Sequence, residues 1–149
     1  MANTETKVVI RSLKAAEIPK MVQVWKAAGL PYKPKGRDSL KNLKSQHHND
    51  CELFLGAFSG NRLVGVVLAS DDGRRAWINR LAVIPEVRRL GVALALVDRA
   101  ERIMKSRGRR LFCAQIEGDN GESVKFFEEA GYKREQDIFY YTKRELKSY

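Results

Sequence analysis

The segment Leu81-Ala82-Val83-Ile84-Pro85-Glu86-Val87-Arg88-Arg89-Leu90-Gly91-Val92-Ala93 decides the fold of this chain. Its first half is apolar and ends at Pro85, which is typical of a strand that stops there. Its second half places two arginines and a glycine directly before a helical pattern. A helix N-terminus has unpaired N–H groups and a partial positive charge, and a glycine lets a bulky anion approach the backbone. The segment therefore predicts either a phosphate-binding turn or a basic turn between two core elements.

The elements on either side of this segment are strongly patterned. Apolar residues recur at helical spacing after Gly91, at Val92, Leu96, Ala100 and Ile103. Gly108 is a natural end for this helix. Upstream, a hairpin over 52–58 and 62–70 leads into a strand over 75–83, which predicts an antiparallel meander. Downstream, 110–116 reads as a strand. A strand, a helix and a second strand in this order favour a parallel pair.

The two ends of the chain predict further elements. Residues 8–11 read as a strand and 16–28 as a helix. Asp38 or Ser39 can cap a second short helix that ends before the polar stretch from His47, which we interpret as a solvated loop rather than a metal site. Asn120 can cap a last helix that Gly131 closes. Residues 132–135 and 138–143 are predicted to be two final strands.

Composition favours one globular domain over 1–149, with an ordered core over about 8–143. The chain has 149 residues, of which 44% are hydrophobic. Residues 1–6 are polar and no apolar run is long enough for a signal peptide or a membrane span, which predicts a cytoplasmic protein. The formal net charge of +10 favours anionic partners. It argues against a polycationic ligand unless Asp71, Asp72 and Glu117 line a local acidic pocket. No zinc-ligand spacing or nucleic-acid-binding signature is present.

Three separated motifs resemble the GCN5-related N-acetyltransferases, the GNAT family. The family pattern Gln/Arg-x-x-Gly-x-Gly/Ala is matched by Arg88, Gly91 and Ala93, and its strand ending Val-x-Pro is matched at 83–85. Asn120, followed by Gly131 and Tyr132, fits the family's downstream pattern. The hairpin Asp72-Gly73-Arg74-Arg75-Ala76-Trp77 is similar to that of small stand-alone bacterial and archaeal members.

The resemblance implies an α/β (α+β) fold with acetyl-CoA as cosubstrate. The expected architecture is a mixed, mostly antiparallel sheet of about six to seven strands with about four helices, splayed at the strand before Arg88–Ala93. The strand backbone pairs with the pantetheine arm, and the N–H groups from Arg89 to Ala93 suit the pyrophosphate. The expected cofactor-binding residues are Leu81, Ala82, Val83, Arg88, Arg89, Leu90, Gly91, Val92, Ala93, Asn120 and Phe127.

The chain departs from the family where acid and base groups are expected. The tyrosine that often serves as general acid falls at Phe127, a glutamate of some members falls at Gln115, and another carboxylate place holds Asn79 or Arg80. Possible replacements are Glu117, Tyr132, Tyr140 and Tyr141, for each of which a surface or core role is the alternative. The catalytic residues are therefore unknown, and no metal is expected.

Three functional hypotheses remain from the sequence. The first is an acetyl-CoA-dependent N-acetyltransferase that acts on an amine of a small molecule or a peptide by direct transfer. The second is a catalytically silent acyl-CoA sensor of the same fold, which the residues at positions 79, 115 and 127 motivate. The third, motivated by the net charge alone, is a nucleic-acid-binding module. The family analogy also raises a possible homodimer formed through the last strands.

Overall fold

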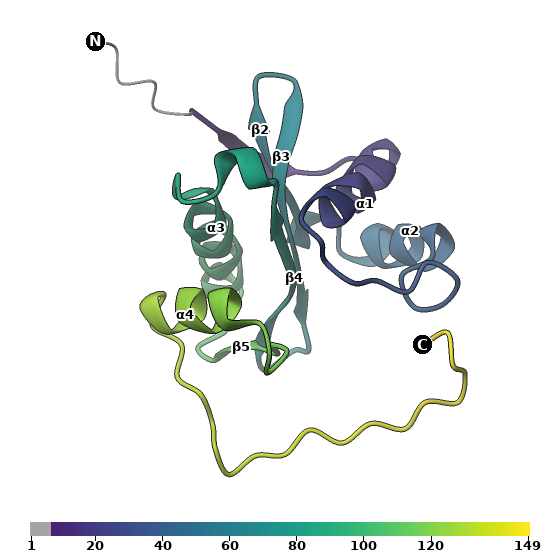
Figure 1. Ribbon diagram of the computed structural model, residues 1–149, viewed down its shortest axis with the longest axis vertical. Coiled ribbons are helices and arrows are strands. Elements are labelled where there is room, and N and C mark those ends of the chain that lie inside the picture. The colour runs from purple at the N-terminus through teal and green to yellow at the C-terminus, as the bar shows by residue number, and fades with distance from the viewer. Residues whose placement is uncertain (1–6) are drawn as a thin grey trace.

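The computed structural model describes residues 7–149 (Figure 1). The polar residues 1–6, for which the sequence predicts no signal peptide, lie outside the described residues. The centre is a sheet of five strands in the order of the sequence. The strands are β1 (Val9–Ser12), β2 (Phe54–Ser59), β3 (Arg62–Asp71), β4 (Ala76–Val83) and β5 (Phe112–Ala114). The first four are antiparallel and β5 is parallel to β4. The predicted meander and parallel pair are confirmed.

Two helices cover each face of the sheet. The helices are α1 (Ile18–Ala27), α2 (Leu40–Asn49), α3 (Val92–Ser106) and α4 (Gly121–Glu129). Short 3₁₀ turns are η1 (Ala15–Glu17), η2 (Cys51–Leu53) and η3 (Pro85–Val87). Figure 1 shows α1 and α2 on one side of the sheet and α3 and α4 on the other. The mixed α/β class and the four helices are as predicted. None of the helices between residues 7 and 149 has the length and apolarity needed to cross a membrane.

The core lies on both faces of β3, which is buried from Leu63 to Ala69. A strand that is covered on both faces has a continuous run of apolar residues in the sequence, and β3 has such a run. On the α3 face, a Cβ added to Gly65 would lie 3.0 Å from Cγ1 of Val92 and 3.1 Å from Cδ1 of Leu96. The first turn of α3 therefore packs directly on the backbone of β3. This close approach fixes the position of the Arg88–Ala93 segment relative to the sheet.

The two predicted C-terminal strands are wrong. Residues 133–149 form no strand and run as an exposed segment beneath the body of the protein, from α4 to the side of α2 (Figure 1). Their end docks there, where Nδ2 of Asn42 lies 3.2 Å from the Tyr149 hydroxyl. A strand needs a neighbouring backbone, and β5, at the edge of the sheet, is only three residues long. The sheet therefore has five strands rather than six to seven.

The interpretation of His47 as part of a solvated loop is also wrong. Helix α2 continues to Asn49, and His47 is buried on it. His47 lies four residues after the buried Leu43, so both side chains face the core on one side of the helix. Its Nε2 is 2.7 Å from the carbonyl oxygen of Leu13, and its ring meets Phe54 edge to face. The cap of this helix is Ser39, whose hydroxyl accepts from the N–H of Asn42.

Replacing Glu17 by glutamine is expected to flatten the acid dependence of stability. Arg11 donates two 2.8 Å hydrogen bonds to the Glu17 carboxylate, which lower its pKa from 4.5 to about 2. A carboxyl whose pKa is depressed in the folded state stabilises the fold above its unfolded pKa, and this stabilisation is lost as pH falls. Urea unfolding between pH 6 and pH 2 measures it. The gap in unfolding free energy between wild type and Glu17→Gln should close from about pH 4.5 towards pH 2.

A matched control for this experiment is Glu86→Gln. Glu86 and its partner Arg62 are both more than 60% exposed, and such pairs contribute little to stability. The Glu86 variant should follow the wild-type pH profile. An unchanged gap at pH 2 for Glu17→Gln would contradict the assignment of the stabilisation to the Glu17 carboxylate.

Candidate functional site

The turn between η3 and α3 presents a run of free backbone donors. Arg89 has φ +65° and Gly91 has φ +80°, both in the left-handed region. Within residues 7–149, the N–H groups of positions 89 to 94 donate to no protein acceptor, and Ala95 is the first to bond, to the carbonyl oxygen of Gly91 at 3.0 Å. Unpaired N–H groups at the N-terminus of a fifteen-residue helix attract anions through their dipoles and the helix field. We call positions 89–94 the N–H cradle.

Gly91 is required by backbone conformation and not by packing. A Cβ built at this position has no heavy atom within 4 Å. The φ of +80° is one that side-chain-bearing residues adopt at a cost. A side chain here would project into open space beside the cradle.

The side chains of the cradle divide into anchoring, buried and exposed groups. Arg88, just before it, donates from Nη2 to the carbonyl oxygen of Ala28 at 3.2 Å, which ties the turn to the end of α1. Val92 is 2% exposed and belongs to the core, so only its N–H faces the anion position. Leu90 is 53% exposed and Ala93 is half-buried. Arg89 is exposed, so its charge is available to a ligand.

The strand that leads to the cradle has an unpaired edge. Strand β5 pairs with β4 only from Ala76 to Ile78. On the other side of β4, Leu68 pairs with Arg80 and Ala69 with Ile78, so Asn79 is a bulge residue. From the bulge to the end of β4, the described chain provides no strand partner on the β5 side. This edge is five residues long, or about 16 Å, and includes Leu81, Ala82 and Val83.

The structure gives Asn120 and Phe127 structural roles. Asn120 caps α4, since its Oδ1 accepts from the N–H of Ser123 at 3.2 Å. Phe127 is 6% exposed and meets Phe126 and Tyr132 edge to face, each at 5.1 Å between ring centroids. Neither side chain is placed against the cradle by a contact in residues 7–149.

None of positions 79, 115 and 132 presents a side chain that is available as a general acid or base. Gln115 is exposed just beyond β5. Asn79 donates to the Ser70 hydroxyl at 2.8 Å. Tyr132 donates to Oε2 of Glu101 at 2.8 Å, and burial together with this carboxylate raises its pKa far above its usual value. Tyr132 therefore keeps its proton and serves as a hydrogen-bond donor to Glu101 of α3.

The other replacements lie on exposed segments. Tyr140 and Tyr141 lie on the C-terminal segment, 71% and 88% exposed. Glu117 is exposed in the loop before α4. The structure therefore identifies no general acid or base.

Sequence reasoning missed a buried ion pair on the opposite face of β4. Nη2 of Arg80 lies 2.6 Å from Oδ2 of Asp38, and both side chains are at most 14% exposed. Arg80 also contacts the carbonyl oxygen of Pro31 and stacks over Trp25 at 5.1 Å. The pair fastens the loop between α1 and α2 to the unpaired part of β4. The two residues are far apart in the sequence, so no local sequence pattern could predict this ion pair.

Comparisons with known proteins agree with this architecture. The model of the acetyltransferase (GNAT) family matches residues 18–132. An acetyltransferase of Sodalis glossinidius (strain morsitans) is 26% identical over 137 residues, which are 91% of this chain and 94% of that protein.

Two solved structures show the same fold at low identity. The PaiA N-acetyltransferase of Thermoplasma acidophilum, crystallised in complex with coenzyme A, is similar with a TM-score of 0.74 and 23% identity, over 87% of this chain and 91% of that chain. The AAC(6')-Iy structure in complex with a bisubstrate analogue, CoA-S-monomethyl-acetylneamine, is similar with a TM-score of 0.76 and 17% identity, over 93% of this chain and 99% of that chain.

Proposed function

The chain belongs to the acetyltransferase (GNAT) family, and from this premise we propose that it is a cytoplasmic, single-domain N-acetyltransferase that passes the acetyl group of acetyl-CoA directly to an amine of a small molecule or a peptide. Family membership makes acetyl transfer its activity and acetyl-CoA its cosubstrate. The observation that carries the proposal is the N–H cradle at the start of α3, next to the unpaired edge of β4.

The residues present fit a coenzyme A molecule. Its pyrophosphate would lie on the N–H cradle, with Arg89 supplying a counter-charge and Gly91 leaving room for the approach. The pantetheine arm would pair with the backbone of Leu81, Ala82 and Val83, as a peptide adds to a sheet edge. The ligand of PaiA and the bisubstrate analogue of AAC(6')-Iy both contain coenzyme A, which supports this assignment.

In this arrangement the thioester end would reach the bulge at Asn79, where β4 and β5 separate. When bound, acetyl-CoA supplies an activated acyl carbon. The chain's own contribution is to hold the two substrates in line, and positioning of this kind accelerates a bimolecular transfer greatly. An amine of lysine type has a pKa near 10.4, so it must lose a proton before it attacks. We propose that water accepts that proton. The C–N bond then forms as the C–S bond of the thioester breaks, and water passes the remaining excess proton of the attacking nitrogen to the departing thiolate.

Thermal unfolding with and without acetyl-CoA tests the binding step. A ligand that binds only the folded state raises its stability by about 2.7 kcal/mol at one hundred times its dissociation constant. We expect the melting temperature to rise with millimolar acetyl-CoA, and free thiol to be released when an amine is added. No shift at that concentration would reject coenzyme A binding altogether.

A second function, a silent acyl-CoA sensor, is favoured by one specific observation. Phe127 is packed in the core, Tyr132 is bound to Glu101, and Asn79 is bound to Ser70, so the usual acid and base positions are engaged elsewhere. Stabilisation by acetyl-CoA without thiol release across a broad amine panel would select the sensor over the enzyme.

We also propose that the protein forms a homodimer through its C-terminal segment. Ile138, Phe139 and Tyr141 are each more than 70% exposed, and β5 is an edge strand. An unpaired edge and an exposed apolar segment of the same chain suit strand addition between two copies. Sedimentation equilibrium should give twice the 17.0 kDa mass of the chain, and Phe139→Asp should return it to the monomer mass.

A further inference from the structure

Two aspartates beside β4 are neutralised by arginines: Asp71, which lies opposite the first residue of the strand, and Asp38, which contacts Arg80 on its unpaired part. Asp71 accepts from Nε of Arg109 at 2.6 Å and from Nη1 of Arg107 at 3.3 Å, and these bonds lower its pKa. Asp38 is held by Arg80. Each carboxylate is already partnered by a cation within the protein. A polycationic ligand would have to compete with these arginines, so Asp71 and Asp38 offer it no free acidic pocket.

Asp72 is likewise engaged. It accepts from the N–H groups of Arg74 and Arg75 and from Nε1 of Trp77, and Arg75 also pairs with it at 3.2 Å. The hydrogen bond from the backbone N–H of Arg75 contributes most to lowering the pKa of Asp72. Of the three carboxylates considered from the sequence, this leaves Glu117, alone in an exposed loop.

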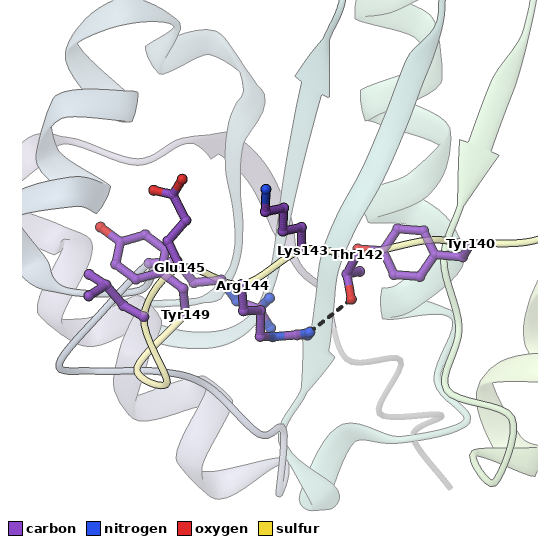
Figure 2. A pocket seen from close by; sticks show the side chains of 8 residues that line it. Tyr140, Thr142, Lys143, Arg144, Glu145 and Tyr149 are labelled. Carbon is purple, nitrogen blue, oxygen red and sulfur yellow. Dashed lines mark hydrogen bonds between the residues drawn. The ribbon is translucent and has the colours of Figure 1, made fainter.

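An open surface groove of about 560 Å³ lies where the C-terminal segment docks on the loop before α2 (Figure 2). Its volume is in the range of small-ligand sites. Three cations and one carboxylate line it, with polar and apolar neighbours: Arg37, Lys143, Arg144, Glu145, Tyr140, Thr142, Leu146 and Tyr149. The lining therefore has an excess of positive charge. We call it the cationic recess.

The arginines of the recess keep donors free for a ligand. Arg144 uses Nη1 to reach the Thr142 hydroxyl at 3.1 Å, the dashed contact in Figure 2. Arg37 is about half exposed and makes only a loose 3.8 Å contact with Asp38. A guanidinium has five N–H donors in a planar fork, which fits a carboxylate. Glu145 also lines the recess and has no ion-pair partner in the described chain. Its negative charge reduces the attraction of the recess for a carboxylate.

The recess is connected to the unpaired part of β4 through the loop before α2. Arg37 directly precedes Asp38, which is bonded to Arg80 on the unpaired part of β4. The same loop carries Tyr32, whose ring lies 5.9 Å from that of Trp25. A molecule whose amine reaches the bulge from this side has its other end near the loop and the recess.

We propose that the acceptor is a small amine that carries carboxylate groups, of the size of an amino acid or a short acidic peptide, and that Arg37 and Arg144 bind its carboxylates. This inference rests on the proposed acetyl transfer and specifies its substrate class. The neutralisation of Asp38 by Arg80 and the cationic recess both favour an anionic acceptor over a polycationic one.

Three C-terminally amidated tripeptides test the inference: Ala-Glu-Glu, Ala-Gln-Gln and Ala-Arg-Arg. Each has one acetylatable amine, and because Glu and Gln are nearly isosteric the first two peptides differ mainly in charge. We expect the KM of the acidic peptide to be about tenfold below that of the neutral one, as one or two charge-assisted hydrogen bonds allow, and the arginine peptide to be the poorest. The double variant Arg37→Gln/Arg144→Gln should abolish the difference in KM between the acidic and the neutral peptide.

Arg134→Gln is the matched control, since Arg134 is exposed on the same segment and does not line the recess. Lys143→Gln provides a second, independent variant of the lining. Equal KM values for the three peptides, or a preference that survives the double variant, would overturn the inference while acetyl transfer stood.

A binding measurement separates this inference from the proposed function. Fluorescence anisotropy of a labelled Ala-Glu-Glu peptide requires no turnover. If acetyl-CoA neither binds nor reacts but the peptide binds about tenfold more weakly to the double variant than to Arg134→Gln, the recess is confirmed and the acetyltransferase function fails. If the peptide binds equally to both variants, the recess is rejected whatever the activity.

Discussion

Replacing Gly91 by glutamate is expected to abolish acetyl-CoA binding while the protein stays folded. The new carboxylate would lie next to the N–H cradle, because Gly91 is itself a cradle residue and a Cβ there meets no atom within 4 Å. It would occupy the position of the pyrophosphate and repel it. A like-charge juxtaposition in a binding site costs several kcal/mol, which is a loss of more than about 100-fold in affinity. Isothermal titration with acetyl-CoA measures that loss.

Gly108→Glu separates the loss of the anion site from backbone strain. Gly108 follows the C-terminal end of the same helix, with φ +90° and nothing within 4 Å of an added Cβ. Each variant forces a side chain into the left-handed region, at about 1–3 kcal/mol. Both should therefore melt at a similarly lowered temperature, and only Gly91→Glu should lose the ligand. Unchanged affinity in Gly91→Glu would show that the pyrophosphate is held elsewhere.

The sequence predicted those parts of the fold that depend on local patterns. Helix α3 follows from an apolar stripe that begins at Val92, and the meander follows from successive apolar runs separated by tight turns. The N–H cradle belongs to this group as well, because a glycine and a helix start are adjacent in the chain. Features of this kind need no knowledge of distant residues.

The features that the sequence predicted wrongly or did not predict depend on partners that are far away in the sequence. Residues 138–143 have a strand-like composition, but a strand forms only beside another backbone, and the three-residue β5 does not pair with them. His47 was expected to be solvated beside His48, whereas its Nε2 lies 2.7 Å from the carbonyl oxygen of Leu13, 34 positions earlier in the chain. The ion pair between Asp38 and Arg80 spans 42 positions, and the bulge at Asn79 depends on register with β3.

Replacing Phe127 by alanine is expected to lower the free energy of unfolding by about 3–5 kcal/mol, the usual cost of removing a buried aromatic ring. Phe127 is 6% exposed and contacts the rings of Phe126 and Tyr132, and Tyr132 is bonded to Glu101 of α3. The cluster thereby attaches α4 to the rest of the protein. Urea unfolding measures the loss, with Phe126→Ala as a control, since the half-buried Phe126 should cost less.

The variant Phe127→Tyr then decides whether this position serves chemistry or packing, because the family's general acid falls here. In a packed core the added hydroxyl has no partner, so the variant should lose about 1–3 kcal/mol of stability and gain nothing in kcat. In an open active site it would keep its stability and raise kcat at neutral pH. The ring contacts on both sides of Phe127 lead us to expect the first result. An increase in kcat would show instead that the ring borders the thioester and that a donor is missing there.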